Sequence, residues 1–279
     1  MAPGRLFVVA TPIGNLEDIT ARAIRILGEV QLIAAEDTRH SRILLQHFGI
    51  TTPLTSYHEH NEAAKTETLL SELQRGKDVA LISDAGTPAI SDPGSRIVRA
   101  AHANGVEVIA VPGPSAPVAA LSASGLPAAP YTFHGFYPRK HSQATAILNQ
   151  AQAFGGTHVF LESPQRLEST LKAIAEAIPQ SEICVAREMT KLFESISVGT
   201  AAEMAQRFAE SRVKGECVIV AHVPATNGEQ RDVSPERLRS LVEKAMRRGG
   251  LSRRDAIRQI AAELNVPRNL VYAAATDSQ

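Results

Sequence analysis

The sequence predicts an α/β protein with two α/β domains and a small all-helical C-terminal domain. Three observations predict this fold class. Short apolar runs alternate with amphipathic stretches along most of the chain, which is typical of sheets covered by helices. Loops rich in Gly and Pro follow three of the apolar runs. Beyond a polar segment near residue 230, the hydrophobic spacing is helical.

Residues 1–113 are expected to form the first domain. Its strands are predicted at residues 5–11, 31–35, 79–83 and 106–111. These runs are apolar throughout, so we expect a parallel sheet with both faces buried. Helices are predicted at residues 18–30, 41–48, 62–75 and 95–104, with Asp18 as an N-cap and Gly49, Gly76 and Gly105 as stops.

Residues 114–224 are expected to form a second, mixed α/β domain. It begins after Pro112-Gly113-Pro114 with a small-residue helix at 115–124. Strands are predicted at residues 159–161, 183–186 and 217–221. Ser163 and Pro164 fit the cap and first residue of a helix, and Thr200 with Glu203 fits a capping box.

Residues 225–279 are expected to hold a linker and a helical tail. The segment 224–233 is polar and rich in turn residues, which indicates a linker. Helices are predicted to begin at Ser234-Pro235, Ser252 and Arg268, with a turn at residues 265–267. The tail has helix-turn-helix spacing in its apolar residues Ala256, Ile260, Ala261, Leu264, Leu270 and Val271.

Composition excludes several classes of protein. The 279 residues carry 29 Lys and Arg against 29 Asp and Glu, so an anionic partner must meet a local basic patch. The chain has no Trp and only 4% aromatic residues, which disfavours a broad base-stacking surface. It has no apolar stretch of the ~20 residues that span a membrane and no signal sequence. Cys184 and Cys217 lie in apolar runs and are expected to be buried thiols, so the predicted location is the cytoplasm.

A metal site is not expected. Tyr57-His58-Glu59-His60 resembles a metal-binding pattern, but the sequence offers no evident third ligand. A histidine in a loop that lines the active cleft is the favoured interpretation.

Three loops are expected to meet at one edge of the first sheet, at residues 11–15, 83–94 and 112–115. Ligands of parallel sheets bind beyond the carboxyl ends of the strands. The sequence lacks a P-loop and a Gly-x-Gly-x-x-Gly motif, and these loops hold no cationic residue for a polyphosphate. They offer backbone amides, hydroxyls, Asp84 and Asp92. This favours a nucleotide-like ligand without phosphates. For each loop taken alone, the alternative is that its Gly and Pro residues serve only to form a turn.

Six motifs, in order, carry a resemblance to a known family. They are ATPIGNLEDIT, AAEDTRH, SDAGTPAISDPG, PGPSA, ALSASGLP and REMTK. Together they resemble the tetrapyrrole methylase superfamily, and within it the enzymes that methylate a cytidine ribose at its 2′-oxygen in 16S RNA of the small ribosomal subunit. The resemblance covers nearly the whole chain. It implies S-adenosylmethionine bound in a deep cleft between two α/β domains, and a homodimer.

Two departures separate this chain from the relatives that methylate porphyrins. Those relatives have a Gly-x-Gly-Pro-Gly-Asp loop after the first strand, where this chain has Ala10-Thr11-Pro12-Ile13-Gly14-Asn15. They also have a shorter Gly-Asp-Pro loop in place of residues 83–94. Both departures favour RNA as the acceptor. A methyltransferase acting on a porphyrin or corrinoid precursor is the alternative, and an RNA-binding protein without activity is a second one.

The resemblance also implies site residues. The positions that match the cofactor site are Pro12, Asp84, Ala85, Gly86, Thr87, Pro88, Ser91, Asp92, Ser115, Gly215 and Glu216. For Glu216, a solvated carboxylate at the start of a strand is the alternative.

A ribose hydroxyl is a poor nucleophile, so a group that accepts its proton would help the reaction. The candidate catalytic residues are Asp37, His40, Glu188 and Lys191. Asp37 has the alternative role of a helix cap, and Glu188 that of an ion-pair partner of Arg187 or Lys191.

RNA contacts are expected from basic residues in two places. In the two α/β domains they are Arg39, Arg42, Arg139 and Lys140. In the tail they are Arg253, Arg254, Arg258 and Arg268, beside Arg247 and Arg248. The predicted partner is RNA of the small ribosomal subunit, and a solvated basic rim on a helical bundle is the alternative for the tail.

Overall fold

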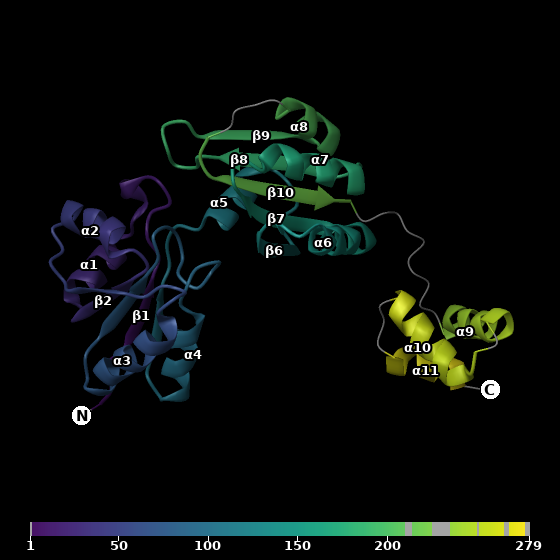
Figure 1. The fold of residues 1–279 in the computed structure, drawn as a ribbon, viewed down its shortest axis with the longest axis horizontal. Helices are drawn as coiled ribbons and strands as arrows, with labels where there is room; N and C mark the ends of the chain where they lie inside the picture. The colour runs from purple at the N-terminus through teal and green to yellow at the C-terminus, as the bar shows by residue number, and fades with distance from the viewer. Residues whose placement is uncertain (1, 210–213, 225–234, 250, 265–267, 277–279) are drawn as a thin grey trace. The chain divides into compact units, whose positions relative to one another are not determined.

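The computed structural model describes residues 2–209, 214–224, 235–249, 251–264 and 268–276 (Figure 1). The chain divides into two compact units, Met1–Pro224 and Ala225–Gln279. Within the described residues, no helix is long and apolar enough to cross a membrane.

The first sheet is parallel, with strands in the order β3-β2-β4-β1-β5. Its strands are β1 (Leu6–Val9), β2 (Leu32–Ala35), β3 (Leu54–Ser56), β4 (Val79–Ile82) and β5 (Val108–Val111). Successive side chains of a strand point to opposite faces. Phe7 therefore packs with the residues of α1 (Ala21–Glu29) and α2 (Thr38–His47), whereas Leu6 packs with those of α3 (Glu62–Gln74) and α4 (Ser95–Ala103). Helices cover both faces, as Figure 1 shows.

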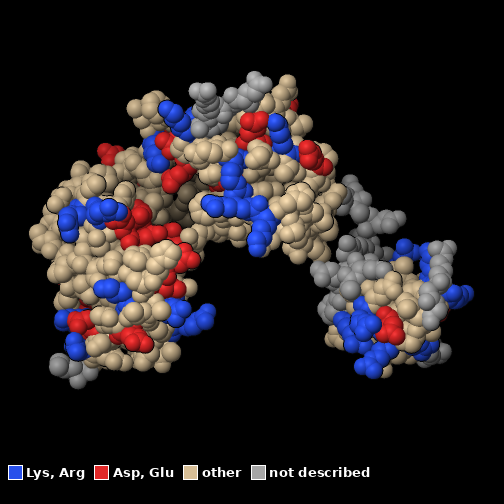
Figure 2. Space-filling view, viewed as in Figure 1, with Lys and Arg blue, Asp and Glu red and all other residues tan. Residues whose placement is uncertain are grey.

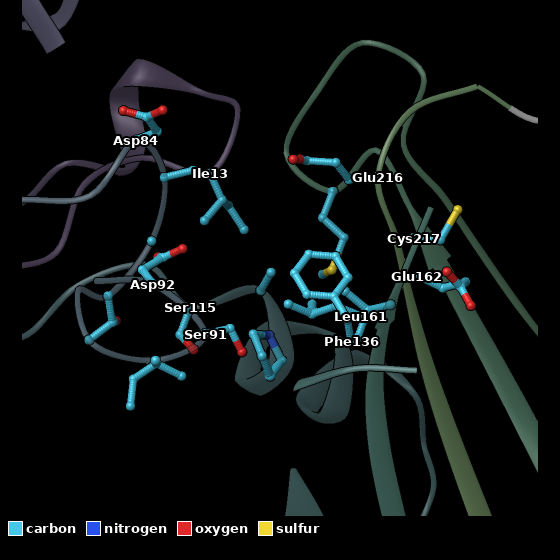
Figure 3. A pocket seen from close by; sticks show the side chains of 18 of the residues that line it. Ile13, Asp84, Ser91, Asp92, Ser115, Phe136, Leu161, Glu162, Glu216 and Cys217 are labelled. Atoms are coloured by element: carbon cyan, nitrogen blue, oxygen red, sulfur yellow. The ribbon is translucent and has the colours of Figure 1, made fainter. Parts of the chain in front are cut away.

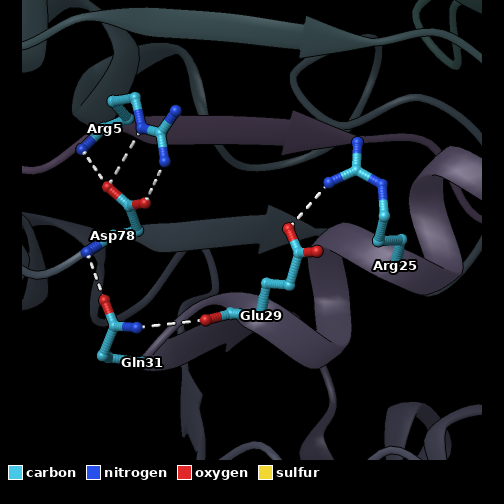
Figure 4. Close-up of polar contacts among 5 residues, drawn as sticks. All are labelled: Arg5, Arg25, Glu29, Gln31 and Asp78. Atoms are coloured by element: carbon cyan, nitrogen blue, oxygen red, sulfur yellow. Dashed lines mark hydrogen bonds and ion pairs between the residues drawn. The ribbon is translucent and has the colours of Figure 1, made fainter.

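A polar cluster closes the amino-terminal edge of this sheet, opposite the loops that carry the motifs (Figure 4). Asp78 accepts hydrogen bonds from the Arg5 backbone N–H at 2.7 Å and from the Arg5 Nη2 at 2.6 Å. The Asp78 N–H donates to Gln31 Oε1 at 2.8 Å, and Gln31 Nε2 donates to the Glu29 carbonyl at 3.0 Å. These bonds join the starts of β1, β2 and β4, so this edge has a structural role.

The second sheet has the order β6-β7-β10-β8-β9, in which only β6 and β7 are parallel. Its strands are β6 (Tyr131–Phe136), β7 (Gly156–Glu162), β8 (Glu182–Arg187), β9 (Ser195–Thr200) and β10 (Cys217–Val223). On one face lie α6 (His141–Phe154), α7 (Leu167–Ala177) and α8 (Ala201–Arg207). On the other lies α5 (Ala116–Ala123), packed on Val159 and Val220. The fold class predicted from the sequence is confirmed.

The C-terminal unit contains α9 (Pro235–Gly249), α10 (Arg253–Leu264) and α11 (Arg268–Thr276). They share a buried core that includes Leu238, Val242, Ile257, Ile260 and Val271. Its all-helical character, predicted from the sequence, is confirmed for the described residues. Leu270, one of the apolar residues in the predicted helix-turn-helix spacing, is 44% exposed. Residues 225–233 of the linker expected at 224–233, and the turn expected at 265–267, lie outside the described residues.

Three predicted helix starts are wrong. The helix predicted to begin at residue 41 is α2, which begins at Thr38 with Asp37 as its cap. The first helix begins at Ala21, and the Thr20 hydroxyl caps it by accepting the Ala23 N–H at 3.1 Å. Asp18 instead ends a short 3-10 turn, η1 (Leu16–Asp18). α7 begins at Leu167, after a turn in which the Arg166 N–H donates to the Ser163 carbonyl at 3.1 Å, and the Ser163 N–H donates to the Glu162 carboxylate at 2.8 Å.

Other local predictions are confirmed. Thr200 and Glu203 form a capping box, and the Ser252 hydroxyl accepts the Asp255 N–H at 3.2 Å. Both cysteines are buried free thiols. The sequence analysis missed β3, β6, α6 and β9. The expected domain boundary at residue 113 falls between β5 and α5, and it stays a prediction.

Candidate active site

The loops after β1, β4 and β5 form one wall at the carboxyl edge of the first sheet, because these strands are adjacent and parallel. Thr11 and Gly86 exchange two backbone hydrogen bonds, of 2.9 and 3.0 Å. The Thr87 hydroxyl donates to the Pro114 carbonyl at 3.1 Å, which ties the second loop to the third. Gly86 has a φ of +79°, a conformation that favours glycine. The three loops predicted to meet do meet.

A cavity of about 380 Å³, called here the main cavity, lies between this wall and the second sheet (Figure 3). Eight predicted cofactor residues line it, namely Asp84, Ala85, Gly86, Thr87, Ser91, Asp92, Ser115 and Glu216. The structure adds further lining residues that the sequence analysis missed, among them Ile13, Glu36, Ile90, Phe136, Leu161, Glu162, Met189 and Val218. Figure 3 shows Ile13 and Asp92 opposite Phe136 and Leu161. The cavity therefore has a polar loop side and a mainly apolar side from the second sheet.

The charge of the main cavity is negative. Burial, with the nearby charge of Glu36, raises the pKa of Asp92 to about 6. Burial, with the charge of Asp84, also raises the pKa of Glu36. Among the described residues that line the cavity there is no Lys or Arg. Such a site suits a ligand that carries positive charge and disfavours a polyphosphate.

A second cavity of about 410 Å³, called here the side cavity, adjoins the first. Ile13, Asp84, Ala85 and Glu216 line both cavities. The side cavity is lined further by Pro12, Gly14, Leu16, His40, Ile43 and Lys191. It thus brings together a predicted cofactor residue, Pro12, and two of the predicted catalytic residues, His40 and Lys191.

Lys191 is held at the border of the two cavities by two carboxylates. Its Nζ lies 3.0 Å from Glu188 Oε1 and 3.2 Å from Glu216 Oε2. Partial burial lowers the pKa of Lys191, but the hydrogen bonds and charges of Glu188 and Glu216 outweigh burial, and the pKa lies above its ordinary value. The hydrogen bond from Lys191 likewise lowers the pKa of Glu188. The predicted Glu188–Lys191 ion pair is present, and its ammonium group remains charged.

Two glycines make this arrangement possible. A Cβ on Gly14 would lie 2.5 Å from Lys191 Cγ and 2.9 Å from Thr190 Oγ1. A Cβ on Gly215, whose φ is +84°, would collide with the Glu188 carboxylate. Gly215 therefore supports the position of Glu188 and does not itself line either cavity. Pro88, another predicted cofactor residue, also lines neither cavity.

Asp37 acts as the helix cap that was its alternative role. Its carboxylate accepts the Arg39 N–H at 2.8 Å and pairs with Arg39 Nη2 at 2.9 Å. The hydrogen bond from the Arg39 side chain lowers the pKa of Asp37 to about 2, so this carboxylate is a weak base. It lines neither cavity.

Other predicted residues lie outside the two cavities. Arg39 and Arg42 are exposed on α2, the helix that carries His40. Arg139 and Lys140 lie where β6 leads into α6, where Arg139 lines a separate cavity. His58 and His60 line neither of the two cavities, and the described residues include no group of three that could hold a metal.

The C-terminal unit carries the predicted basic surface. Between residues 235 and 276, Lys and Arg outnumber Asp and Glu by nine to four. Arg253, Arg254 and Arg268 are exposed and form no ion pair with a described residue, whereas Arg258 pairs with Asp255 at 3.0 Å. Figure 2 shows mainly blue side chains on the visible face of this unit.

Comparison with known proteins gives consistent results. A family model described as tetrapyrrole (corrin/porphyrin) methylases matches residues 5–205. A protein of Pseudomonas aeruginosa named ribosomal RNA small subunit methyltransferase I is 49% identical over 245 residues, which is 86% of each chain. A protein of the same name from Escherichia coli O157:H7 is 42% identical and covers 99% of this chain and 96% of its own.

A solved structure shares the fold at lower identity. It is uroporphyrin-III C-methyltransferase from Thermus thermophilus in complex with S-adenosylhomocysteine, with a TM-score of 0.56 and 19% identity. The alignment covers 78% of this chain and 97% of that one.

Proposed function

We propose, since this chain belongs to the tetrapyrrole methylase family, that it methylates the 2′-oxygen of a cytidine ribose in the 16S RNA of the small ribosomal subunit. As a member of this family, the chain is a methyltransferase that uses S-adenosylmethionine. The acceptor is the proposed part. The observation that carries it is that a relative named for this RNA aligns over 99% of the chain, including the basic C-terminal unit that lies beyond the family model.

The main cavity fits the cofactor. Its volume of about 380 Å³ lies within the range of small-molecule sites, roughly 300–1,000 Å³. When bound, S-adenosylmethionine supplies a methyl group on a positively charged sulfur. Asp92, Asp84 and Glu36 complement that positive charge, and the apolar lining residues, among them Ile90 and Val218, suit a flat adenine. Gly86 allows the loop backbone to approach the ligand closely.

The side cavity is proposed to receive the acceptor ribose, because it shares lining residues with the main cavity. Lys191 stays charged, so it donates a hydrogen bond to the ribose and does not take its proton. The His40 imidazole, which lines the same cavity, is placed to accept the proton that the 2′-hydroxyl loses on methylation. The cofactor would supply the methyl group by breaking its sulfur–methyl bond and would leave as neutral S-adenosylhomocysteine. Positioning of the hydroxyl against an activated methyl group supplies much of the rate.

The test is methyl transfer from labelled S-adenosylmethionine to small subunits from cells that lack this protein, with ribose methylation mapped on the RNA. We expect label at one cytidine 2′-oxygen. Lys191→Met and His40→Ala should each reduce turnover by a factor of about 100 while binding of the cofactor in calorimetry is retained. Cofactor binding with no label on RNA would reject the acceptor and favour a porphyrin or corrinoid precursor.

A further inference from the structure

The loop between β8 and β9 carries two exposed apolar side chains beside the side cavity. Leu192 is 90% exposed and Phe193 is 70% exposed. They directly follow Lys191, which lines the cavity. Neighbouring large apolar side chains that stay in water at a site of chemistry indicate a surface that is covered by a ligand.

The loop is held in one shape although its tip is exposed. Glu188 and Thr190 adopt left-handed conformations, with φ of +49° and +66°. The Lys191 N–H donates to the Glu188 carbonyl at 3.0 Å, and the Glu194 N–H donates to the Lys191 carbonyl at 3.0 Å. Unfavourable backbone conformations persist at functional sites where their surroundings fix them. The tip of the loop is therefore held in a fixed conformation before a ligand binds.

The surroundings of the tip combine charged and apolar side chains. The loop itself carries Glu194 and Lys191, and Lys191 is paired with Glu188 and Glu216. Across the side cavity lies α2, which presents His40 and the 67% exposed Ile43 to it. Arg39 and Arg42 are exposed on the same helix, and Arg42 has no ion-pair partner among the described residues. An aromatic ring with cations nearby suits a nucleotide, whose base stacks on the ring while its phosphate meets the cations.

We infer that Phe193 is a stacking platform for a nucleobase of the RNA, and that this contact positions the acceptor ribose in the side cavity. The inference rests on the proposed function and names how the same site holds its substrate. Leu192 extends the apolar surface, and Lys191 holds the ribose that follows the stacked base. The family motif REMTK ends at Lys191, so no motif marked Phe193.

Substitutions separate stacking from simple apolar contact. Phe193→Ala should lower kcat/KM for the small subunit roughly tenfold, with cofactor binding unchanged. Phe193→Tyr should retain activity because its ring also stacks, whereas Phe193→Leu should lose as much as Phe193→Ala. Phe154→Ala, at a 56% exposed position at the end of α6 that lines neither cavity, is the matched control and should change nothing.

Stacking on residue 193 can be measured directly by Trp fluorescence, because the chain has no Trp of its own. Phe193→Trp introduces a single Trp that can be excited selectively over the four Tyr, and its emission should be quenched by 16S RNA and unchanged by S-adenosylmethionine alone. Phe154→Trp should not be quenched. Static light scattering of the wild type and Phe193→Ala reports whether the tip instead contacts a second copy of the chain.

Several results would overturn the inference. They are unchanged kinetics in Phe193→Ala, full activity in Phe193→Leu, an unquenched Phe193→Trp, or a dimer that dissociates in Phe193→Ala. If the wild type labels RNA and Phe193→Ala is unaffected, only this inference fails. If the wild type itself places no label on RNA, the proposed acceptor fails and the inference fails with it.

Discussion

Asp92 lines the main cavity with a pKa raised to about 6, because burial and the charge of Glu36 disfavour its ionised form. A bound cation favours the ionised form. As the pH falls from 7.5 to 5, Asp92 takes up a proton and its attraction for the sulfonium is lost. We expect the Kd of S-adenosylmethionine to rise about tenfold over this range, the factor that one unit of pKa represents. Calorimetry at a series of pH values measures it.

Two controls accompany this measurement. Asp92→Asn should bind the cofactor more weakly at pH 7.5 and show little further loss toward pH 5. S-adenosylhomocysteine, which lacks the sulfonium charge, should show a weaker pH dependence in the wild type. A pH dependence that is equally steep in Asp92→Asn would assign it to Glu36 instead, whose pKa is also raised.

The polar residues in the loops after β4 and β5 were predictable, whereas Glu36, Glu162 and most apolar lining residues were not. Asp84, Asp92 and Ser115 stand in loops whose Gly and Pro content marks them in the sequence. Phe136 and Val218 come from strands of the second sheet, where an apolar residue that faces a cavity has the same sequence pattern as one in the core. Ile13 was recoverable, because it lies between Pro12 and Gly14 of the motif ATPIGNLEDIT.

The junction of the β8–β9 loop with β10 depends on Gly215. Ala at this position would be strained at a φ of +84° and would displace the Glu188 carboxylate that holds Lys191. We expect Gly215→Ala to lower turnover at least tenfold, because a small misplacement of a positioning group costs rate. Steady-state methyl transfer, with circular dichroism to verify folding, measures this.

Gly28→Ala is the matched control for that substitution. Gly28 lies within α1 and a Cβ there would meet nothing within 4 Å. Ala should therefore raise stability by about 0.5–1 kcal/mol and leave turnover unchanged. Equal turnover in the two variants would show that Glu188 does not position Lys191.

Burial decided which elements the sequence predicted. Strands β1, β2, β4 and β10 are almost fully buried, and their continuous apolar runs stand out. β6 and β9 are the edge strands of the second sheet and are largely exposed, so their sequences YTFHGF and SISVGT show no continuous apolar run. α6 was recoverable, since Ala144, Leu148 and Ala151 are buried at helical spacing.

The formal net charge of +0 conceals an uneven distribution of charge. The main cavity is acidic, which suits a cationic cofactor and repels RNA phosphates. The C-terminal unit has nine Lys and Arg against four Asp and Glu. Affinity for RNA must therefore come from groups outside the main cavity, and the C-terminal unit is the proposed source.

Three arginines of that unit lie where they oppose its stability. Arg253 and Arg254 begin α10 and Arg268 begins α11, at the positive ends of two helix dipoles. They form no ion pair with a described residue, so their placement is better explained by a ligand than by the fold. We therefore propose RNA docking, rather than a solvated rim, as the role of these three arginines.

Changing all three arginines to Gln should leave the melting temperature unchanged or raise it, because unfavourable dipole interactions worth about 0.3 kcal/mol or more each are removed. It should weaken binding of 16S RNA and reduce the slope of log K against log salt by about 2–3, close to one per lost phosphate contact. Binding of S-adenosylmethionine should not change.

Arg25→Gln is the control for this experiment. Arg25 lies in α1, where it pairs with Glu29, and its substitution should leave the salt slope unchanged. A lower melting temperature with an unaltered salt slope would mean that these arginines serve the helical bundle, and RNA docking would then have to be sought on α2.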